Sequence, residues 1–91
     1  MPKVQRSVRV VNAAGLHARP CHQLASAALA GRSEVRVRCE DREADCKSIL
    51  DLMTLAAPQG SVLEFSVEGA DAEAVAERLS QVVASGFGEP A

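Results

Sequence analysis

The chain has 91 residues and a formal net charge of −2, with 47% hydrophobic and 24% charged residues. That length predicts one domain over residues 1–91 with a single hydrophobic core. The slightly negative charge and an aromatic content of 2% argue against a nucleic-acid partner, which needs clustered cations and stacking surfaces. Three cysteines without a Cys-x-x-Cys pair favour a reducing compartment. Because no signal-like or membrane-length apolar run occurs, we expect a cytoplasmic protein that does not enter a membrane.

The first half of the chain predicts a strand, a helix and a second strand. Valines alternate with polar residues over 4–10, which is typical of a strand with one buried face. The Ala-rich segment 17–30 has an apolar stripe at helical spacing and is followed by Gly31, a natural helix stop. Apolar and charged residues then alternate over 34–40, and a polar turn follows at 40–43.

The middle of the chain predicts two short elements. A strand is expected at Ala44–Cys46 and a helix at Ser48–Leu55. Ser48 and Asp51 have the spacing of a capping box, in which each side chain binds the other residue's backbone amide. Pro58-Gln59-Gly60 should end this region.

The last part predicts a strand and the most amphipathic helix of the chain. Alternation over 62–68 indicates the strand, and Asp71 is a plausible N-cap for a helix over 72–83. Gly86-Phe87-Gly88 should end the helix and leave a frayed tail. The element order then predicts an α+β fold in which a four-stranded antiparallel sheet is covered on one face by three helices.

The segment most informative about function lies where the first strand gives way to the first helix. It reads Gly15-Leu16-His17-Ala18-Arg19-Pro20. A mostly neutral imidazole can attack phosphorus, and the unpaired amides and positive dipole of a helix N-terminus stabilise a phosphoryl group. Arg19 adds a guanidinium fork suited to phosphate oxygens or to an acidic partner. From these residues alone, an ordinary capping or surface histidine remains the simpler interpretation of His17.

Four segments together resemble one protein family. They are Gly15–Pro20 followed by Gln23 and Leu24, then Lys47-Ser48-Ile49-Leu50, Gln59-Gly60-Ser61 and Glu68-Gly69-Ala70-Asp71-Ala72. This set is similar to the histidine-containing phosphocarrier (HPr) family of the phosphoenolpyruvate-dependent phosphotransferase system, over nearly the whole chain. The resemblance implies the open-faced β-sandwich of that family, with element order βαββαβα.

The resemblance also implies roles for the residues at the first helix. His17 would accept a phosphoryl group from enzyme I, usually on Nδ1, and pass it to a IIA-type domain. Arg19 would assist transfer and docking, and the backbone amides of Ala18 and Arg19 would hold the phosphate. Such a protein is a carrier with no turnover of its own, and it needs no cofactor or metal.

One departure and one alternative go with this resemblance. Ala14 replaces the polar residue common directly before the glycine in sugar-transport carriers, so a side-chain contribution is lost there. The segments 12–15 and 86–89 look more like the regulatory, nitrogen-related branch. The alternative function is therefore a regulatory module that acts through protein interactions instead of sugar transport.

Ser48 is the second candidate site. By pattern it is a helix N-cap, whereas the resemblance makes it a target of an HPr kinase/phosphorylase. A phosphate there would suit the helix dipole and would place negative charge beside an apolar docking surface, to which Leu50, Met53 and Leu55 could contribute.

Two further residues near His17 have simpler interpretations. Cys21 lies one helical turn after His17, so a metal site can be imagined, but zinc needs three or four ligands and no Cys/His cluster is close in sequence. We expect Cys21 to be a small buried hydrophobic residue and His22 to be solvated. A small ligand- or metal-binding domain with an accidental motif is the remaining interpretation.

Overall fold

The computed structural model describes residues 1–91 and has the element order expected from the sequence. The strands are β1 (Lys3–Arg9), β2 (Glu34–Cys39), β3 (Arg42–Asp45) and β4 (Val62–Glu68). The helices are α1 (Ala18–Ala30), α2 (Ile49–Met53) and α3 (Ala72–Ala84), followed by a 3-10 turn, η1 (Gly86–Gly88).

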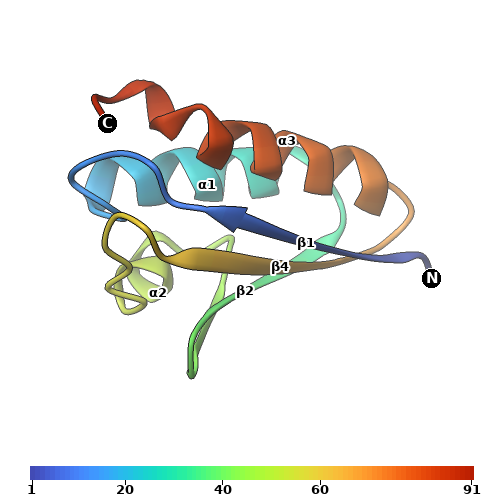
Figure 1. The fold of residues 1–91 in the computed structure, drawn as a ribbon. Coiled ribbons are helices and arrows are strands. Elements are labelled where there is room, and N and C mark those ends of the chain that lie inside the picture. Colours follow the sequence, from blue (N-terminus) through green and yellow to red (C-terminus); the bar gives the residue numbers. More distant parts are fainter.

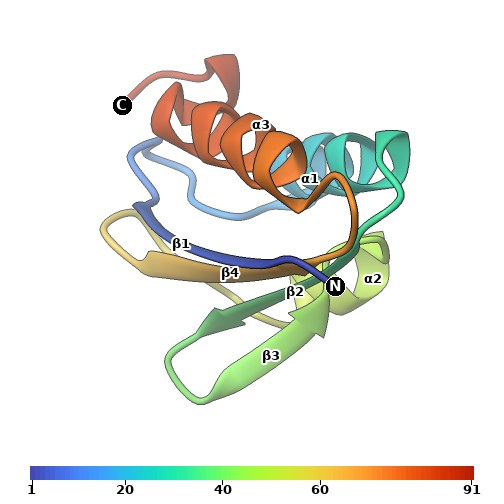
Figure 2. The same ribbon diagram turned by 90° about the vertical axis from the view of Figure 1, so that its right-hand side faces the viewer.

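The strands form one antiparallel sheet in the order β1-β4-β2-β3. Helices α1 and α3 lie side by side over one face of this sheet (Figure 1). The short helix α2 packs against α1 near β3 (Figure 2). The opposite face of the sheet is open to solvent. The α+β open-faced sandwich that the sequence predicts is therefore confirmed.

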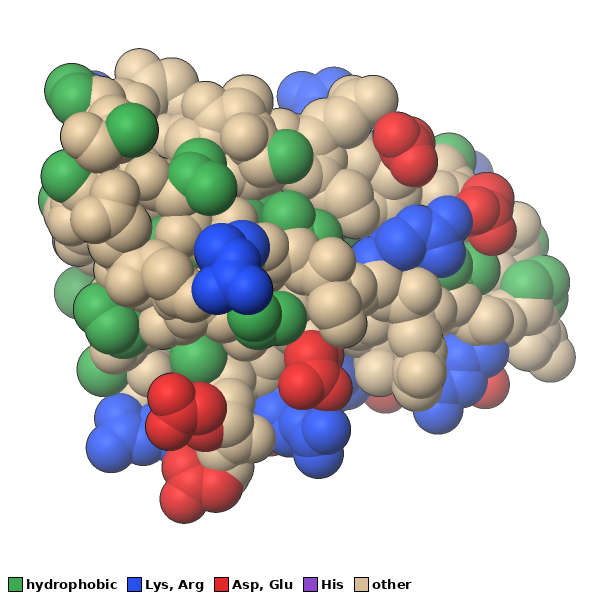
Figure 3. All heavy atoms as spheres, in the orientation of Figure 1, with side chains coloured by type: hydrophobic (Ala, Val, Ile, Leu, Met, Phe, Trp, Pro, Cys, Tyr) green, Lys and Arg blue, Asp and Glu red, His purple; other side chains and the backbone are tan.

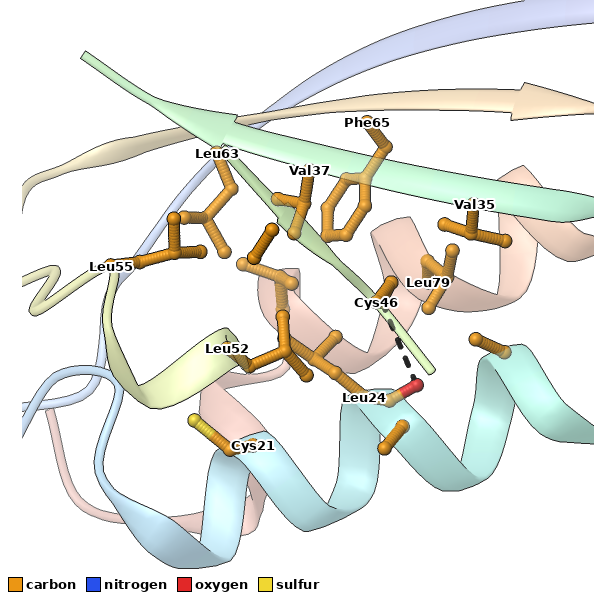
Figure 4. Packing of buried hydrophobic residues seen from close by; sticks show 14 of the residues in the cluster. Cys21, Leu24, Val35, Val37, Cys46, Leu52, Leu55, Leu63, Phe65 and Leu79 are labelled. Atoms are coloured by element: carbon orange, nitrogen blue, oxygen red, sulfur yellow. Dashed lines mark hydrogen bonds between the residues drawn. The ribbon is translucent and has the colours of Figure 1, made fainter. Parts of the chain in front are cut away.

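The core fills the space between the sheet and the helices. It contains 23 buried hydrophobic residues, and aliphatic side chains and Phe65 supply most of its bulk. Leu24 of α1 and Leu52 of α2 point toward Val37 and Phe65 of the sheet (Figure 4). Both helices are thus fixed to the sheet by burial of apolar surface.

All three cysteines, Cys21, Cys39 and Cys46, are buried in this core. Cys46 donates a weak hydrogen bond to the Leu24 carbonyl, with Sγ and oxygen 3.9 Å apart (Figure 4). Burial raises the pKa of Cys46 to about 12, with smaller contributions from Asp45 and Cys21. Burial alone raises the pKa of Cys21 to about 11. Both thiols stay protonated at neutral pH, and the expectation of a buried Cys21 is confirmed.

The bounds of two predicted elements were wrong. Strand β3 spans Arg42–Asp45, not Ala44–Cys46, because the turn contains only Glu40 and Asp41 and Cys39 pairs directly with Arg42. Glu40 has a positive φ of 57°, which makes this tight turn possible. Helix α2 ends at Met53, two residues before the predicted end at Leu55.

The predicted capping box at α2 forms only in part. The Ser48 hydroxyl accepts a hydrogen bond from the Asp51 amide, with the two atoms 3.2 Å apart. The Asp51 carboxylate does not return to the Ser48 amide. Instead it accepts from the Asp45 amide at 2.7 Å, because that donor from the end of β3 is within reach.

Asp71 holds the predicted N-cap position of α3, but its side chain makes no bond to that helix. Its carboxylate accepts from the Arg32 amide at 2.9 Å and from the Ser33 hydroxyl. These bonds, that of Ser33 above all, lower the pKa of Asp71. Asp71 therefore joins the turn after α1 to the start of α3.

The surface carries charges of both signs. Acidic and basic side chains are interspersed on the face shown in Figure 3. On the open face of the sheet, Arg36 pairs with Glu43 and Arg38 with Glu64, each at 2.9 Å. None of the helices has both the length and the apolar character needed to span a bilayer.

Candidate functional site at the start of α1

The loop between β1 and α1 places His17 at the surface. His17 is the N-cap of α1, with an extended backbone (φ −92°, ψ −167°) and a side chain that is 44% exposed. The preceding residue, Leu16, is buried, and its amide donates to the Ala57 carbonyl at 2.8 Å. Because Leu16 is anchored in the core, the ring next to it is held outward at a fixed place.

Gly15 makes this close approach possible. Its φ is +69°, in the left-handed region that favours glycine. A Cβ atom at this position would also lie only 2.6 Å from the Ala57 carbonyl oxygen. Both the conformation and the contact therefore require glycine, in agreement with a tight turn before His17.

Two backbone amides beside His17 have no acceptor within the protein. The first bond of α1 runs from the Cys21 amide to the His17 carbonyl at 3.1 Å. The amides of Ala18 and Arg19 make no such bond, and Pro20 has no N–H. At the positive end of the helix dipole, these two donors form a place suited to an anion.

The C-terminal tail is not frayed as predicted, but folds back over this site. Three successive positive φ values, at Gly86 (70°), Phe87 (57°) and Gly88 (73°), reverse the chain after α3. Phe87 is buried, and its carbonyl accepts from the Gln23 side chain at 3.1 Å. As a result, the C-terminus lies at the end of the molecule where α1 begins (Figure 1).

Glu89 of this tail contacts the His17 ring directly. Both carboxylate oxygens lie 2.9 Å from Nε2, and the Glu89 side chain is only 14% exposed. The Asn12 amide nitrogen lies 3.0 Å from the same carboxylate and 2.9 Å from the Gly15 carbonyl. The hydrogen bond from His17, together with Asn12 and the charge of Arg19, lowers the pKa of Glu89.

Sequence reasoning did not assign a role to Glu89 or Asn12. Both lie in segments that it had noted only as marks of a family branch. The contact joins residues 72 positions apart, and such a contact leaves no periodic signal in the sequence. The only sequence signal for this contact was a carboxylate, Glu89, directly after the Gly86-Phe87-Gly88 turn.

The other predicted residues occupy separate places. Arg19 is exposed and forms no ion pair within the protein. Ser48 is half-buried at the start of α2, with Leu50 (80%) and Met53 (45%) exposed beyond it. The expectation that Leu55 contributes to this surface was wrong, because Leu55 is buried.

His22 is exposed as expected, and no group of three or more potential metal ligands occurs.

Comparison with known proteins identifies the family and the fold of this chain. The family model described as PTS HPr component phosphorylation site matches residues 4–85. This chain belongs to the HPr family. Phosphocarrier protein HPr of Neisseria meningitidis serogroup A is 36% identical over 86 residues, which are 94% of this chain and 97% of the relative. Phosphocarrier protein HPr of Lysinibacillus sphaericus is 40% identical over 74 residues, covering 81% of this chain and 84% of that protein.

Solved HPr structures share the whole architecture. The crystal structure of HPr from Thermoanaerobacter tengcongensis superposes with a TM-score of 0.88 at 33% identity and covers 100% of both chains. Membership of the HPr family, expected from the motifs, is thus confirmed. The family model ends at residue 85, so Glu89 lies outside the matched residues.

Proposed function

We propose that this chain is a phosphocarrier that accepts a phosphoryl group on His17 from enzyme I and passes it to a IIA-type domain. It acts as a cytoplasmic intermediate between enzymes, without turnover of its own and without a membrane or nucleic-acid partner. The observation that carries this proposal is an exposed imidazole at a helix N-cap, next to two backbone amides without acceptors.

The geometry supports a specific set of contacts for the phosphoryl group. Nε2 of His17 faces the Glu89 carboxylate, which leaves Nδ1 as the ring nitrogen available to phosphorus. The amides of Ala18 and Arg19 would then bind the phosphoryl oxygens at the positive end of α1. The Arg19 guanidinium, unpaired within the chain, would add a cation for those oxygens or for a carboxylate of the partner.

The surface around His17 suits acidic partners with an apolar contact area. Residues 10–33, which include all of α1, contain no acidic side chain. Leu50 and Met53 of α2 supply exposed apolar surface near α1. Enzyme I and the IIA-type domain would dock here in turn, each bringing its own phosphohistidine or catalytic groups to the same ring.

Phosphorylation with enzyme I and phosphoenolpyruvate tests the carrier function. The wild-type protein should gain a phosphate that is labile in acid and stable in base, and His17→Ala should gain none. His22→Ala is the matched control, because His22 is the only other histidine and is exposed on the same helix. A wild-type protein that takes up no phosphate would contradict the proposal.

We propose that Ser48 is a regulatory site for an HPr kinase/phosphorylase. Its hydroxyl caps α2, so a phosphate there would meet the amides at the start of that helix and would put negative charge beside Leu50 and Met53. Incubation with the kinase and ATP should give an acid-stable phosphate that is absent from Ser48→Ala. An unmodified wild-type product would exclude this site.

The regulatory alternative to sugar transport rests on the segments 12–15 and 86–89. The hydrogen bond between Asn12 and Glu89 joins these two segments at His17, so the features typical of the nitrogen-related branch meet at the site itself. Transfer from the phosphorylated protein to a sugar-specific and to a nitrogen-related IIA domain separates the two functions. Preference for the nitrogen-related domain would favour the alternative, and preference for the sugar-specific domain would exclude it.

A further inference from the structure

We propose that Glu89 and Asn12 are positioning residues that keep a proton on Nε2 of His17 throughout the phosphoryl cycle. This inference rests on the proposed phosphocarrier function and adds to it a role for the C-terminal tail. Asn12 contacts Glu89, and Glu89 contacts Nε2 of the ring. Glu89 lies beyond the part of the chain that the family model matches.

The hydrogen bonds of Asn12 favour the ionised form of Glu89. The Asn12 amide nitrogen has two N–H groups, and they point to the Gly15 carbonyl and to Oε1 of Glu89. A flipped amide would place two acceptors against each other at Gly15, so the orientation of the side chain is determined by its partners. Since Asn12 donates to it, Oε1 of Glu89 acts as an acceptor, as an ionised carboxylate does.

The carboxylate in turn fixes the tautomer of His17. An ionised carboxylate can only accept, so the ring nitrogen 2.9 Å from it has to donate. The proton is therefore on Nε2, and the lone pair of the neutral ring is on Nδ1. The choice of nucleophilic nitrogen thus follows from a tail residue and from the buried amide that holds it.

The surroundings keep Glu89 ionised. Asn12 is completely buried, so its donor stays in place, and the Glu89 side chain is only 14% exposed. The charged or titratable groups that face the carboxylate are His17 and Arg19, and both favour its negative form. No acidic side chain lies in the segment 10–33 from which these partners come.

A proton held on Nε2 matters in both directions of transfer. When Nδ1 attacks, the N–P bond forms with the lone pair of Nδ1, and the bond from phosphorus to the donor breaks with its electron pair going to the donor. The ring then carries substituents on both nitrogens and a positive charge, next to the Glu89 carboxylate. In the next transfer a nucleophile of the IIA-type domain forms a bond to phosphorus with its lone pair. The N–P bond breaks, its electron pair returns to Nδ1, and a neutral imidazole leaves.

Without the carboxylate, the phosphorylated ring loses its Nε2 proton more readily as the pH rises. The leaving group would then be an imidazolate anion, which is a much poorer leaving group than neutral imidazole. Glu89→Gln keeps the shape of the side chain but can either donate to Nε2 or accept from it. We therefore expect this variant to lose the tautomer preference and to transfer phosphate more slowly at higher pH.

The test combines ¹⁵N NMR of the His17 ring with transfer rates measured across the range in which histidine titrates and above it. Wild-type protein should show mainly the Nε2–H tautomer, and Glu89→Gln a mixture of both. The rate of transfer from phosphorylated Glu89→Gln to a IIA domain should begin to fall about one pH unit lower than the wild-type rate does. In the pH range where both rates fall, the variant should therefore transfer about tenfold more slowly. Asn12→Ala should show a smaller change in the same direction.

Glu40→Gln is the matched control, because it removes the same charge at an exposed turn on another part of the chain. It should behave as wild type. A predominant Nδ1–H tautomer in the wild-type protein would overturn the inference without any variant. A pH profile of Glu89→Gln identical to that of the control would also overturn it and leave the carrier function standing. Failure of the wild type to accept phosphate would instead contradict the proposed function, and this inference with it.

Discussion

At the scale of single residues, His17 adjoins two groups of opposite polarity. The amides of Ala18 and Arg19 follow it at the positive end of α1 and suit an anion. The Glu89 carboxylate contacts its Nε2 and suits a ring that carries a positive charge. Gly15 sets the position of the ring, because no other residue fits the turn beside Ala57.

Arg19 should matter for transfer and not for folding. Arg19→Ala removes a cation next to His17, and we expect slower phosphate uptake from enzyme I with unchanged stability, since an exposed arginine contributes little to it. Arg32→Ala is the matched control beyond the opposite end of the same helix. Equal transfer rates for the two variants, measured under single-turnover conditions, would exclude the role of Arg19.

Gly15 should be sensitive to the smallest added side chain. Gly15→Ala places Cβ against the Ala57 carbonyl at a positive φ, and we expect a loss of about 1–3 kcal/mol in the free energy of unfolding. At Gly60, φ is also positive (94°), but a Cβ atom there would have no neighbour within 4 Å, so Gly60→Ala should cost less. Urea denaturation compares the two, and similar losses would show that the contact with Ala57 is unimportant.

At the scale of secondary structure, both ends of α1 are held by segments from the last third of the chain. The tail after α3 binds the start of α1 through Glu89 and the Phe87 carbonyl. Asp71, at the beginning of α3, binds the turn after α1 through Arg32 and Ser33. The position of the first helix, and with it the site, therefore depends on where α3 begins and ends.

Asp71 should make stability depend on pH in the acid range. Its pKa is lowered in the folded protein, so its contribution is fully present above the ordinary carboxyl pKa and is lost as the pH falls through the folded value. Asp71→Asn should be less stable than wild type at neutral pH, and the difference should shrink in acid. Denaturant midpoints measured from neutral pH to below the usual Asp range check this, and a constant difference would contradict it.

At the scale of the whole molecule, much of the fold could be predicted because it rests on local patterns. Alternating valines marked the strands, and the stripe over 72–83 marked α3. The hydrogen-bond partners of the Asp51 and Asp71 carboxylates were harder to predict, because each carboxylate has several amides within reach. Sequence spacing alone does not determine which of these amides is bound. The β2–β3 turn lacked a strong hairpin signal, so its length was misjudged.

The candidate site could be predicted only on its α1 side. The motif from Gly15 to Pro20 is contiguous, and it indicated the imidazole, the amides and Arg19. The opposite side comes from Asn12 and Glu89, which meet only after three residues with positive φ turn the chain back. A Gly-Phe-Gly segment reads equally well as a helix stop before a loose tail, so the sequence could not distinguish the two.

The central claim is that a phosphoryl group is carried on Nδ1 of His17. Phosphorylation of uniformly ¹⁵N-labelled protein, followed by measurement of one-bond coupling between ³¹P and ¹⁵N, tests it most directly. We expect coupling to Nδ1 of His17 alone, with Nε2 still bearing a proton. Coupling to Nε2, or a phosphate on any other residue after reaction with enzyme I, would contradict the account.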